Sequence, residues 1–393
     1  MKHAVLSLSL ALFALPTMVF AQDAGGNITE GCVETYDASV NYFPDQAVVE
    51  YASGFQVEYF NHYKVVTVSE PWLGAEQDFS YVLVQCGTPA PETVENAVVI
   101  EVPIQSIAVM STTYLSHLVQ LGLVESLVAL DETDFAYAPE VREAIDAGQV
   151  VEIGSGPTLN VELALDLEPD LTMTYGIGSP EYDVHPTLTD AGLDVVLNGD
   201  YMETDPLGRA EWIKFTSLFF NREAEANALF SEVATAYHDL SELAVTVEDR
   251  PLVLNNAPYA GTWYLSGGES FAVQLISDAG GEYILSDNTS TGSVALSFEE
   301  VVDIASEADI WINPSFWYTL SDGLAEDERY IDFAAFENGQ LYNNNLRVNE
   351  FFGNDYDESG VTRPDLVLAD LIAIFHPDLL PNHEFVYYRQ LPE

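Results

Sequence analysis

The residue types that carry catalysis are present in this sequence, but not at the spacings that enzymes use. The 393 residues contain no G-x-S-x-G, no G-x-x-x-x-G-K-[ST] and no H-E-x-x-H segment. Gly154-Ser155-Gly156 and Gly176-Ile177-Gly178 follow apolar runs but lack a third glycine in register, so loop packing explains them better than dinucleotide binding. Because 64 residues are acidic, carboxylate pairs abound and none is specific for a glycosidase. We expect no enzyme, and a secreted carboxylate-dependent hydrolase is the alternative from a different class.

The histidines do not form a metal-binding group either. None of the seven shows the short spacing of metal ligands. They are His3, His62, His117, His185, His238, His376 and His383. Only His185, with Tyr175 and Tyr182 nearby in the sequence, is placed where it could approach a ligand. We predict no metal site and no cofactor.

Polar and aromatic residues gather directly after the apolar runs, where open α/β sheets place their ligand crevice. Aromatic faces and amides around a guanidinium suit a bulky, partly apolar ligand with anionic groups. The residues we expect to line this site are Thr112, Tyr175, Trp263, Trp317, Asn345 and Arg347. For the two tryptophans a place in the core is the alternative, and for Arg347 it is a buried structural ion pair.

The elements that must position these residues show two sequence patterns. From Gly31 to Val102 short alternating runs separated by Gly and Pro predict a small antiparallel β unit. After Pro103, and again after Pro251, short apolar runs alternate with helical segments, which predicts parallel sheets covered on both faces. Between the two α/β regions, residues 207–243 carry apolar residues at three- to four-residue steps without a proline, which predicts one helix about 50 Å long.

The fold class is therefore α/β, with two Rossmann-like lobes joined by a single long helix and preceded by a β-rich extension. The chain is long enough for two separate cores. The expected boundaries are a signal peptide at 1–21, the extension at 22–97, the first lobe at 98–205, the linking helix at 206–245 and the second lobe at 246–393.

The net charge and the N-terminal segment limit which partners and which compartment are expected. The formal net charge of −53 disfavours nucleic acid and anionic membrane surfaces, and it leaves a cationic or metal-bearing ligand possible. A basic start, an apolar run and small residues before Ala21 predict export with cleavage after Ala21, to the periplasm or the exterior. In an oxidising compartment Cys32 and Cys86 most simply pair with each other, and two buried free thiols are the alternative.

Three stretches resemble the substrate-binding proteins of ABC importers for ferric siderophores, haem and cobalamin. These stretches are 106–113, 160–171 and 206–212, and the most specific is Asn160-Val161-Glu162-Leu163-Ala164-Leu165-Asp166-Leu167-Glu168-Pro169-Asp170-Leu171. Residues 296–302 form a similar stretch in the second lobe. The resemblance covers about 98–383 and implies a monomeric binding protein that carries a ferric siderophore to an ABC permease, with cobalamin or haem as the alternative ligand.

The resemblance also implies how the permease is contacted. Members of this group present one surface glutamate on each lobe to arginine pockets of the permease, and these fall on Glu162 and Glu299. Two negative charges far apart on the binding protein would fix its orientation on a cationic receptor and speed docking. Ordinary first-turn helix acids are the alternative, and the neighbouring Glu300 makes the second assignment ambiguous.

Overall fold

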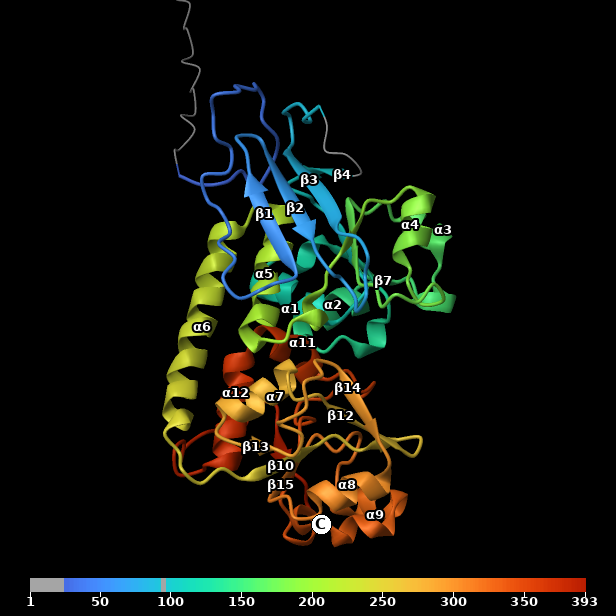
Figure 1. Ribbon diagram of the computed structural model, residues 1–393. Helices are drawn as coiled ribbons and strands as arrows, with labels where there is room; N and C mark the ends of the chain where they lie inside the picture. Colours follow the sequence, from blue (N-terminus) through green and yellow to red (C-terminus); the bar gives the residue numbers. More distant parts are fainter. Residues whose placement is uncertain (1–24, 93–96) are drawn as a thin grey trace, which may run out of the picture.

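The computed structural model describes residues 25–92 and 97–393, so the predicted signal peptide lies outside the described part. Figure 1 shows a small β unit at one end, a first α/β lobe below it and a second α/β lobe at the other end. Within the described residues, no helix is both long and apolar enough to span a bilayer.

The N-terminal unit is a four-stranded sheet in the order β1-β2-β3-β4. Its strands are β1 (Phe55–Tyr59), β2 (Tyr63–Val68), β3 (Phe79–Gln85) and β4 (Val98–Val102). Alternate residues of β2 are buried, as expected for a sheet with one covered face. The predicted antiparallel pairing holds for β1–β2 and β2–β3, whereas β3 and β4 pair in parallel. The Cys32–Cys86 disulfide ties the start of the unit to the end of β3.

The first lobe is a parallel five-stranded sheet in the order β7-β6-β5-β8-β9. Strands β5 and β8 are buried along their whole length, as parallel strands covered on both faces must be. The elements, in chain order, are β5 (Ile107–Val109), α1 (Thr113–Gln120), β6 (Leu127–Leu130), α2 (Pro139–Asp146), β7 (Val151–Glu152), α3 (Val161–Asp166), β8 (Leu171–Thr174), α4 (His185–Ala191) and β9 (Val195–Leu197).

The segment between the lobes is two helices, which corrects the predicted uninterrupted one. Helix α5 (Pro206–Phe220) ends where Asn221 takes the left-handed conformation (φ 58°), and α6 (Glu223–Val245) starts in a new direction. Helix α6 packs against α5 of the first lobe and then against helices of the second lobe. A single helix therefore joins the lobes, but it has 23 residues and is about 35 Å long, not 50 Å.

The second lobe has a mixed sheet in the order β13-β10-β15-β16-β17 and a smaller antiparallel sheet, β11-β12-β14. Its larger sheet is parallel except for the β16–β17 pair. The strands are β10 (Leu252–Asn255), β11 (Pro258–Tyr259), β12 (Thr262–Ser266), β13 (Glu282–Tyr283), β14 (Ser293–Leu296), β15 (Ile310–Ile312), β16 (Leu341–Asn343) and β17 (Arg389–Gln390). The helices are α7 (Phe271–Asp278), α8 (Phe298–Ala305), α9 (Leu320–Glu326), α10 (Ala334–Glu337), α11 (Asp355–Thr362) and α12 (Pro364–Phe375).

Two buried glutamates fasten the N-terminal unit to the first lobe. The carboxylates of Glu203 and Glu211 accept five consecutive backbone N–H groups, those of residues 50–54, at 2.6–3.1 Å. Lys214 balances Glu211 at 2.7 Å, with both side chains almost fully buried. Charge-assisted bonds of this kind hold residues 50–54 against the N-terminal half of α5.

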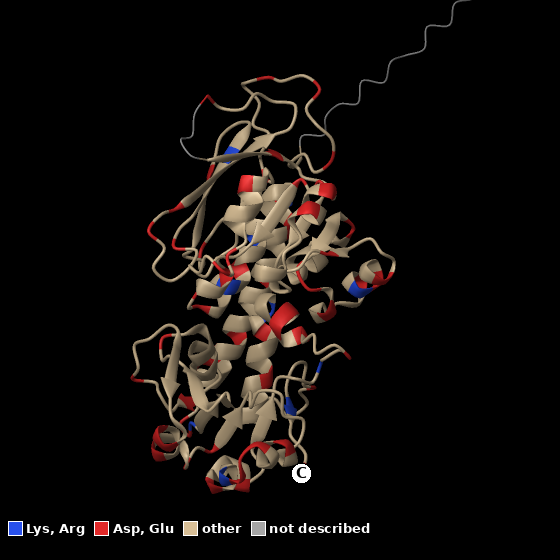
Figure 2. Ribbon diagram, turned by 90° about the vertical axis from the view of Figure 1, so that its right-hand side faces the viewer, with Lys and Arg blue, Asp and Glu red and all other residues tan. Residues whose placement is uncertain are grey.

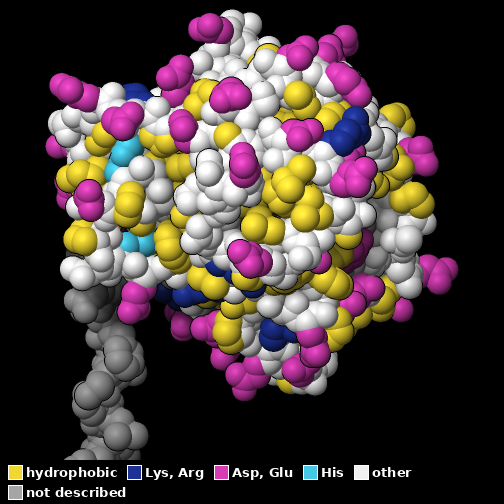
Figure 3. All heavy atoms as spheres, turned by 90° about the horizontal axis from the view of Figure 1, so that it is seen from below, with side chains coloured by type: hydrophobic (Ala, Val, Ile, Leu, Met, Phe, Trp, Pro, Cys, Tyr) yellow, Lys and Arg dark blue, Asp and Glu magenta, His cyan; other side chains and the backbone are white. Residues whose placement is uncertain are grey.

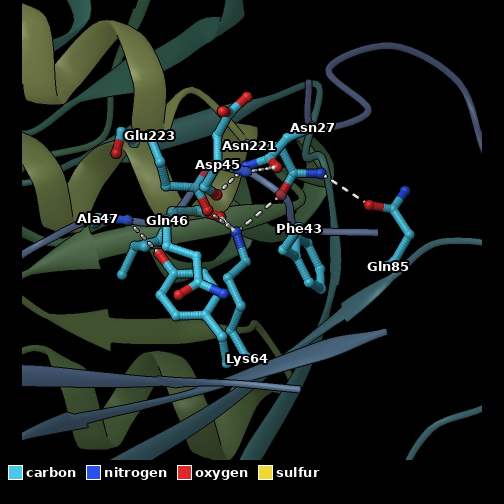
Figure 4. Close-up of polar contacts among 12 residues, drawn as sticks. Asn27, Phe43, Asp45, Gln46, Ala47, Lys64, Gln85, Asn221 and Glu223 are labelled. Atoms are coloured by element: carbon cyan, nitrogen blue, oxygen red, sulfur yellow. Dashed lines mark hydrogen bonds and ion pairs between the residues drawn. The ribbon is translucent and has the colours of Figure 1, made fainter. Parts of the chain in front are cut away.

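A third buried glutamate ties the sheet itself to the turn between α5 and α6. Lys64 of β2 is fully buried, and its Nζ lies 2.6 Å from Oε1 of Glu223, which is also fully buried (Figure 4). The same ammonium donates to the Leu218 carbonyl and to Asn221 Oδ1. The N-terminal unit is thus an integral part of the first lobe and not a loose appendage.

The surface carries the acidic charge of the sequence on both lobes. Figure 2 shows Asp and Glu scattered over the N-terminal unit and both lobes, and Figure 3 shows them spread between apolar patches on one face. The two described lysines are both buried, so the exposed cations of the described part are arginines. This spread of negative charge favours solubility.

Candidate functional site

The loops that follow the strands of the first lobe form one half of the candidate site. Thr112 and Tyr175, which follow β5 and β8, are both partly exposed. The Tyr201 hydroxyl donates to the Gly176 carbonyl at 2.6 Å, which joins the loops after β8 and β9. Burial raises the pKa of Tyr175, and the negative charges of Asp131 and Glu132, which follow β6, raise it further. The carboxyl edge of this sheet is therefore lined by tyrosines and carboxyl groups.

Burial raises the pKa of two of these carboxyl groups. Burial raises the pKa of Asp131 to about 6. Burial also raises the pKa of Asp200, which follows β9, and Arg209 on α5 opposes that rise from 3.5 Å. The Arg209 guanidinium lies over the Phe271 ring of the second lobe, 4.7 Å from its centroid. Arg209 thus links the carboxyl edge of the first sheet to the start of α7 across the junction between lobes.

The second lobe contributes exposed aromatic side chains at the corresponding strand ends. Tyr259, shortly after β10, is 74% exposed, and Phe316, after β15, is 76% exposed. Arg347 follows β16, and its side chain is half exposed and bonded to Asp355 at 3.0 Å. Exposed rings at strand ends in both lobes leave large apolar faces available to a ligand.

Direct hydrogen bonds bridge the lobes beside these loops. Glu358 of α11 is almost fully buried, and its carboxylate accepts the N–H groups of Tyr137 and Ala138 at 2.7 and 3.0 Å. These two N–H groups lie just before α2 of the first lobe, so Glu358 ties the segment that leads into α2 to α11. Burial raises the pKa of Glu358 to about 7. Asn349 adds a bond from its Nδ2 to the Ala136 carbonyl at 2.9 Å.

A cavity of about 190 Å³ lies between the lobes next to Arg209. Thr113, Arg209, Phe271 and Asp357 lie on its wall, and burial raises the pKa of Asp357. Because the two lobes share this wall, the cavity is part of their junction and its charged lining is a guanidinium and a carboxyl group. In the sequence, Arg209 stood out only as part of a family-like stretch, and its rarity as one of eight arginines was the available signal.

A larger cavity, about 830 Å³, lies elsewhere. It is lined by Ile104, Gln105, Asp170 and Asp194, which stand at the amino ends of strands, beside the disulfide of the N-terminal unit. It does not include the residues that follow the strands, so size alone does not mark the ligand site in this fold.

Two of the six predicted ligand residues are buried in the core of the second lobe. Trp263 and Trp317 are 0% and 1% exposed and pack around Trp311 in the core of the second lobe, so a ligand cannot touch them there. Asn345 is also buried, and its amide bonds to the Trp317 carbonyl and the Arg389 guanidinium. Its contacts are those of a residue that shapes the loop after β16.

The other three predicted ligand residues stand on carboxyl-edge loops with accessible surface. Thr112 and Tyr175 belong to the first lobe, and Arg347 belongs to the second. No bond joins Arg347 to the other two, so the three do not form one compact cluster.

The two predicted docking residues are exposed and lie one on each lobe (Figure 1). Glu162 is in the first turn of α3, and Glu299 is in the first turn of α8. Glu300, which made the second assignment ambiguous, forms a capping box with Ser297 at the start of α8, and these hydrogen bonds lower the pKa of Glu300. Glu299 is therefore the freer carboxylate of the two, although Arg329 lies 3.4 Å from it.

His185 is not at the junction between lobes. Its ring packs against Trp72 and Phe79 of the N-terminal unit, with centroids 5.5 and 6.0 Å away, and burial lowers its pKa. No group of three or more His, Cys, Asp and Glu side chains in residues 25–92 and 97–393 is arranged to hold a metal ion.

Comparisons with known proteins agree with this architecture. A family model described as periplasmic binding protein matches residues 107–344. An uncharacterised lipoprotein of Methanocaldococcus jannaschii is 26% identical over 311 residues, covering 75% of this chain and 71% of the relative. A possible iron-binding protein of Staphylococcus epidermidis has a TM-score of 0.54 at 17% identity, covering 69% of this chain and 98% of that one. A periplasmic heme-binding protein of Pseudomonas aeruginosa has a TM-score of 0.52 at 19% identity, covering 70% and 93%. At these identities the two structures show a shared fold.

Proposed function

Because this chain belongs to the periplasmic binding protein family, we propose that it captures a bulky metal chelate between its two lobes and delivers it to an ABC permease. A ferric siderophore is the first candidate ligand. Solute-binding proteins of this kind are not enzymes, so the hydrolase considered from the sequence is set aside.

The observation that carries the proposal is the pairing of exposed rings with a half-exposed guanidinium at the strand ends. Tyr259 and Phe316 offer apolar faces from the second lobe, and Tyr175 offers a partly exposed ring from the first. Arg347 supplies a charged donor suited to carboxylate, catecholate or hydroxamate oxygens. A small inorganic ion would leave most of this apolar surface in water, whereas a large organic chelate would cover it.

Haem and cobalamin are the alternative ligands within the same class. Both present flat apolar faces with peripheral carboxylate or amide groups, which rings and a guanidinium also suit. The heme-binding protein of Pseudomonas aeruginosa supports the first of these by its fold only.

Delivery places the protein outside the cytoplasm, facing a membrane permease. The family match and the lipoprotein relative support an extracytoplasmic place, and export through the segment 1–21 is part of the proposal. Glu162 and Glu299 are proposed to contact the permease, since both are exposed first-turn carboxylates on different lobes.

Isothermal titration calorimetry of the mature protein tests the proposal. The probes are a catecholate and a hydroxamate ferric siderophore, haem and cyanocobalamin, with ferric nitrilotriacetate as the control for non-specific iron binding to the acidic surface. We expect one chelate to bind saturably at one site, and Arg347→Gln to weaken it while the matched surface variant Arg222→Gln does not. Binding of ferric nitrilotriacetate alone, or of no probe, would refute chelate capture.

A further inference from the structure

The connection between β2 and β3 brings the N-terminal unit to the carboxyl edge of the first lobe. We call residues 69–78 the Trp72 loop. Strand β2 runs down the first lobe towards the second, and this loop continues from its end (Figure 1). The loop lies outside residues 107–344, to which the family match is limited.

Trp72 rests on the glycine segment that follows β8. A Cβ on Gly176 would lie 2.5 Å from the indole, and one on Gly178 would lie 2.9 Å from it. Only glycine leaves room for the ring at these two positions, which explains the Gly176-Ile177-Gly178 segment by packing. Pro71 lies near Gly199, which follows β9: a Cβ on Gly199 would be 3.4 Å from the Pro71 Cα, an ordinary van der Waals contact.

The tip of the loop is a turn that presents an apolar side chain to solvent. The Ala75 N–H donates to the Trp72 carbonyl at 3.0 Å, and Gly74 takes the positive φ of 80° that the turn requires. Leu73, inside this turn, is 84% exposed, the largest exposed fraction among the large hydrophobic side chains described. Covering this exposed leucine with a binding partner would lower the free energy, because apolar surface is removed from water.

Neighbouring loops extend the same apolar surface. Ile177 is 48% exposed and lies between the two glycines that carry the indole. Tyr201 is 36% exposed and bonds to the Gly176 carbonyl. Tyr182 is 53% exposed and lies beside Gly156, after β7. The exposed apolar side chains thus continue from the Trp72 loop across the ends of β7, β8 and β9.

We propose that the Trp72 loop is part of the ligand-binding surface, and that Trp72 and Leu73 contact the apolar face of the bound chelate. This inference rests on the proposed function. It assigns the N-terminal unit a role in ligand selection, because the buried carboxylates Glu203, Glu211 and Glu223 fix the unit on the first lobe and so fix the loop's position.

The test compares Leu73→Asp with Val48→Asp in the full mature protein. Val48 is a matched control because it is 58% exposed and belongs to the same unit, but lies beside Asn227 of α6. Affinities for the siderophores, haem and cyanocobalamin are measured by calorimetry. For the probe that binds, Leu73→Asp should weaken binding about tenfold or more, since it removes the leucine side chain that the bound ligand would cover. Val48→Asp should stay within about twofold.

Three results separate the two proposals. Equal affinities for Leu73→Asp, Leu73→Ala and the unaltered protein would overturn the role of the loop and leave chelate capture standing. Failure of the unaltered protein to bind any probe would overturn chelate capture and this inference with it. Weakening by both Leu73→Asp and Val48→Asp would also overturn the inference, because the effect would then follow the added charge and not the position.

Discussion

The buried Lys64–Glu223 pair makes the most specific stability prediction, through the variant Lys64→Met. In the native structure the Lys64 ammonium donates to Glu223, Asn221 and the Leu218 carbonyl, and it lies 4.6 Å from the centroid of the Phe43 ring. Burial lowers the pKa of Lys64, and the negative charge of Glu223 opposes that shift. Methionine keeps the approximate length of the side chain but supplies neither the charge nor the donors.

The expected cost follows from what is left behind. Removing one partner leaves an uncompensated carboxylate with 0% exposure, which costs about 3–5 kcal/mol in the free energy of unfolding. In a unit of about 200 residues, a loss of this size lowers the melting temperature by about 6–20 °C. The double variant Lys64→Met/Glu223→Gln removes the buried charge as well, so we expect it to recover at least half of the loss.

Differential scanning calorimetry of the three proteins, read at the first unfolding transition, measures both effects. A melting temperature of Lys64→Met within about 1 °C of the unaltered protein would refute the anchoring role of the pair. A double variant as unstable as the single one would show that lost packing, and not the unpaired carboxylate, causes the loss. An unchanged melting temperature of Lys64→Met would also leave the Trp72 loop without this anchor.

Two further predictions concern the permease and the junction between lobes. Glu162→Ala with Glu299→Ala should abolish uptake in cells and leave chelate affinity unchanged, whereas the control pair Asp166→Ala with Asp303→Ala, on the same helices, should leave both uptake and affinity unchanged. Unchanged uptake for the first pair would refute docking through Glu162 and Glu299. The folded-state pKa of Glu358 is raised from 4.5 to about 7, so the stability that its bound proton provides is present below pH 4.5 and is lost as the pH rises through 7. As the pH rises from 4.5 to about 8, the free energy of unfolding measured in urea titrations should therefore fall by about 3 kcal/mol less for Glu358→Gln than for the unaltered protein. Equal pH profiles of the two proteins would contradict the raised pKa.

The sequence predicted the lobes well because short apolar runs and their turn residues are local signals. Runs such as Leu171–Thr174 are buried on both faces, and a short apolar run of this kind predicts a buried strand of a parallel sheet. The break at Asn221 was missed because asparagine is tolerated inside helices, and its left-handed conformation here accompanies bonds to Lys64 and the Ile28 carbonyl from far along the chain.

The candidate site was less accessible to prediction, because exposure is a tertiary property. Trp263 and Phe316 both lie near strand ends in the sequence, yet one is fully buried and the other 76% exposed. Trp72 was absent from the predicted site because its packing on Gly176 and Gly178, which are distant in the sequence, is a tertiary contact. Four of the five tryptophans are fully buried, so Trp72 is the indole that a bound ligand could cover directly.

The most direct test of the central claim is a crystal structure of the mature protein with the chelate that binds most tightly in calorimetry. We expect density for the chelate between the lobes, in contact with Tyr175 of the first lobe and Arg347 of the second. Density confined to the large cavity beside the Cys32–Cys86 disulfide, or to the outer surface of one lobe, would contradict capture at the carboxyl edges of the two sheets.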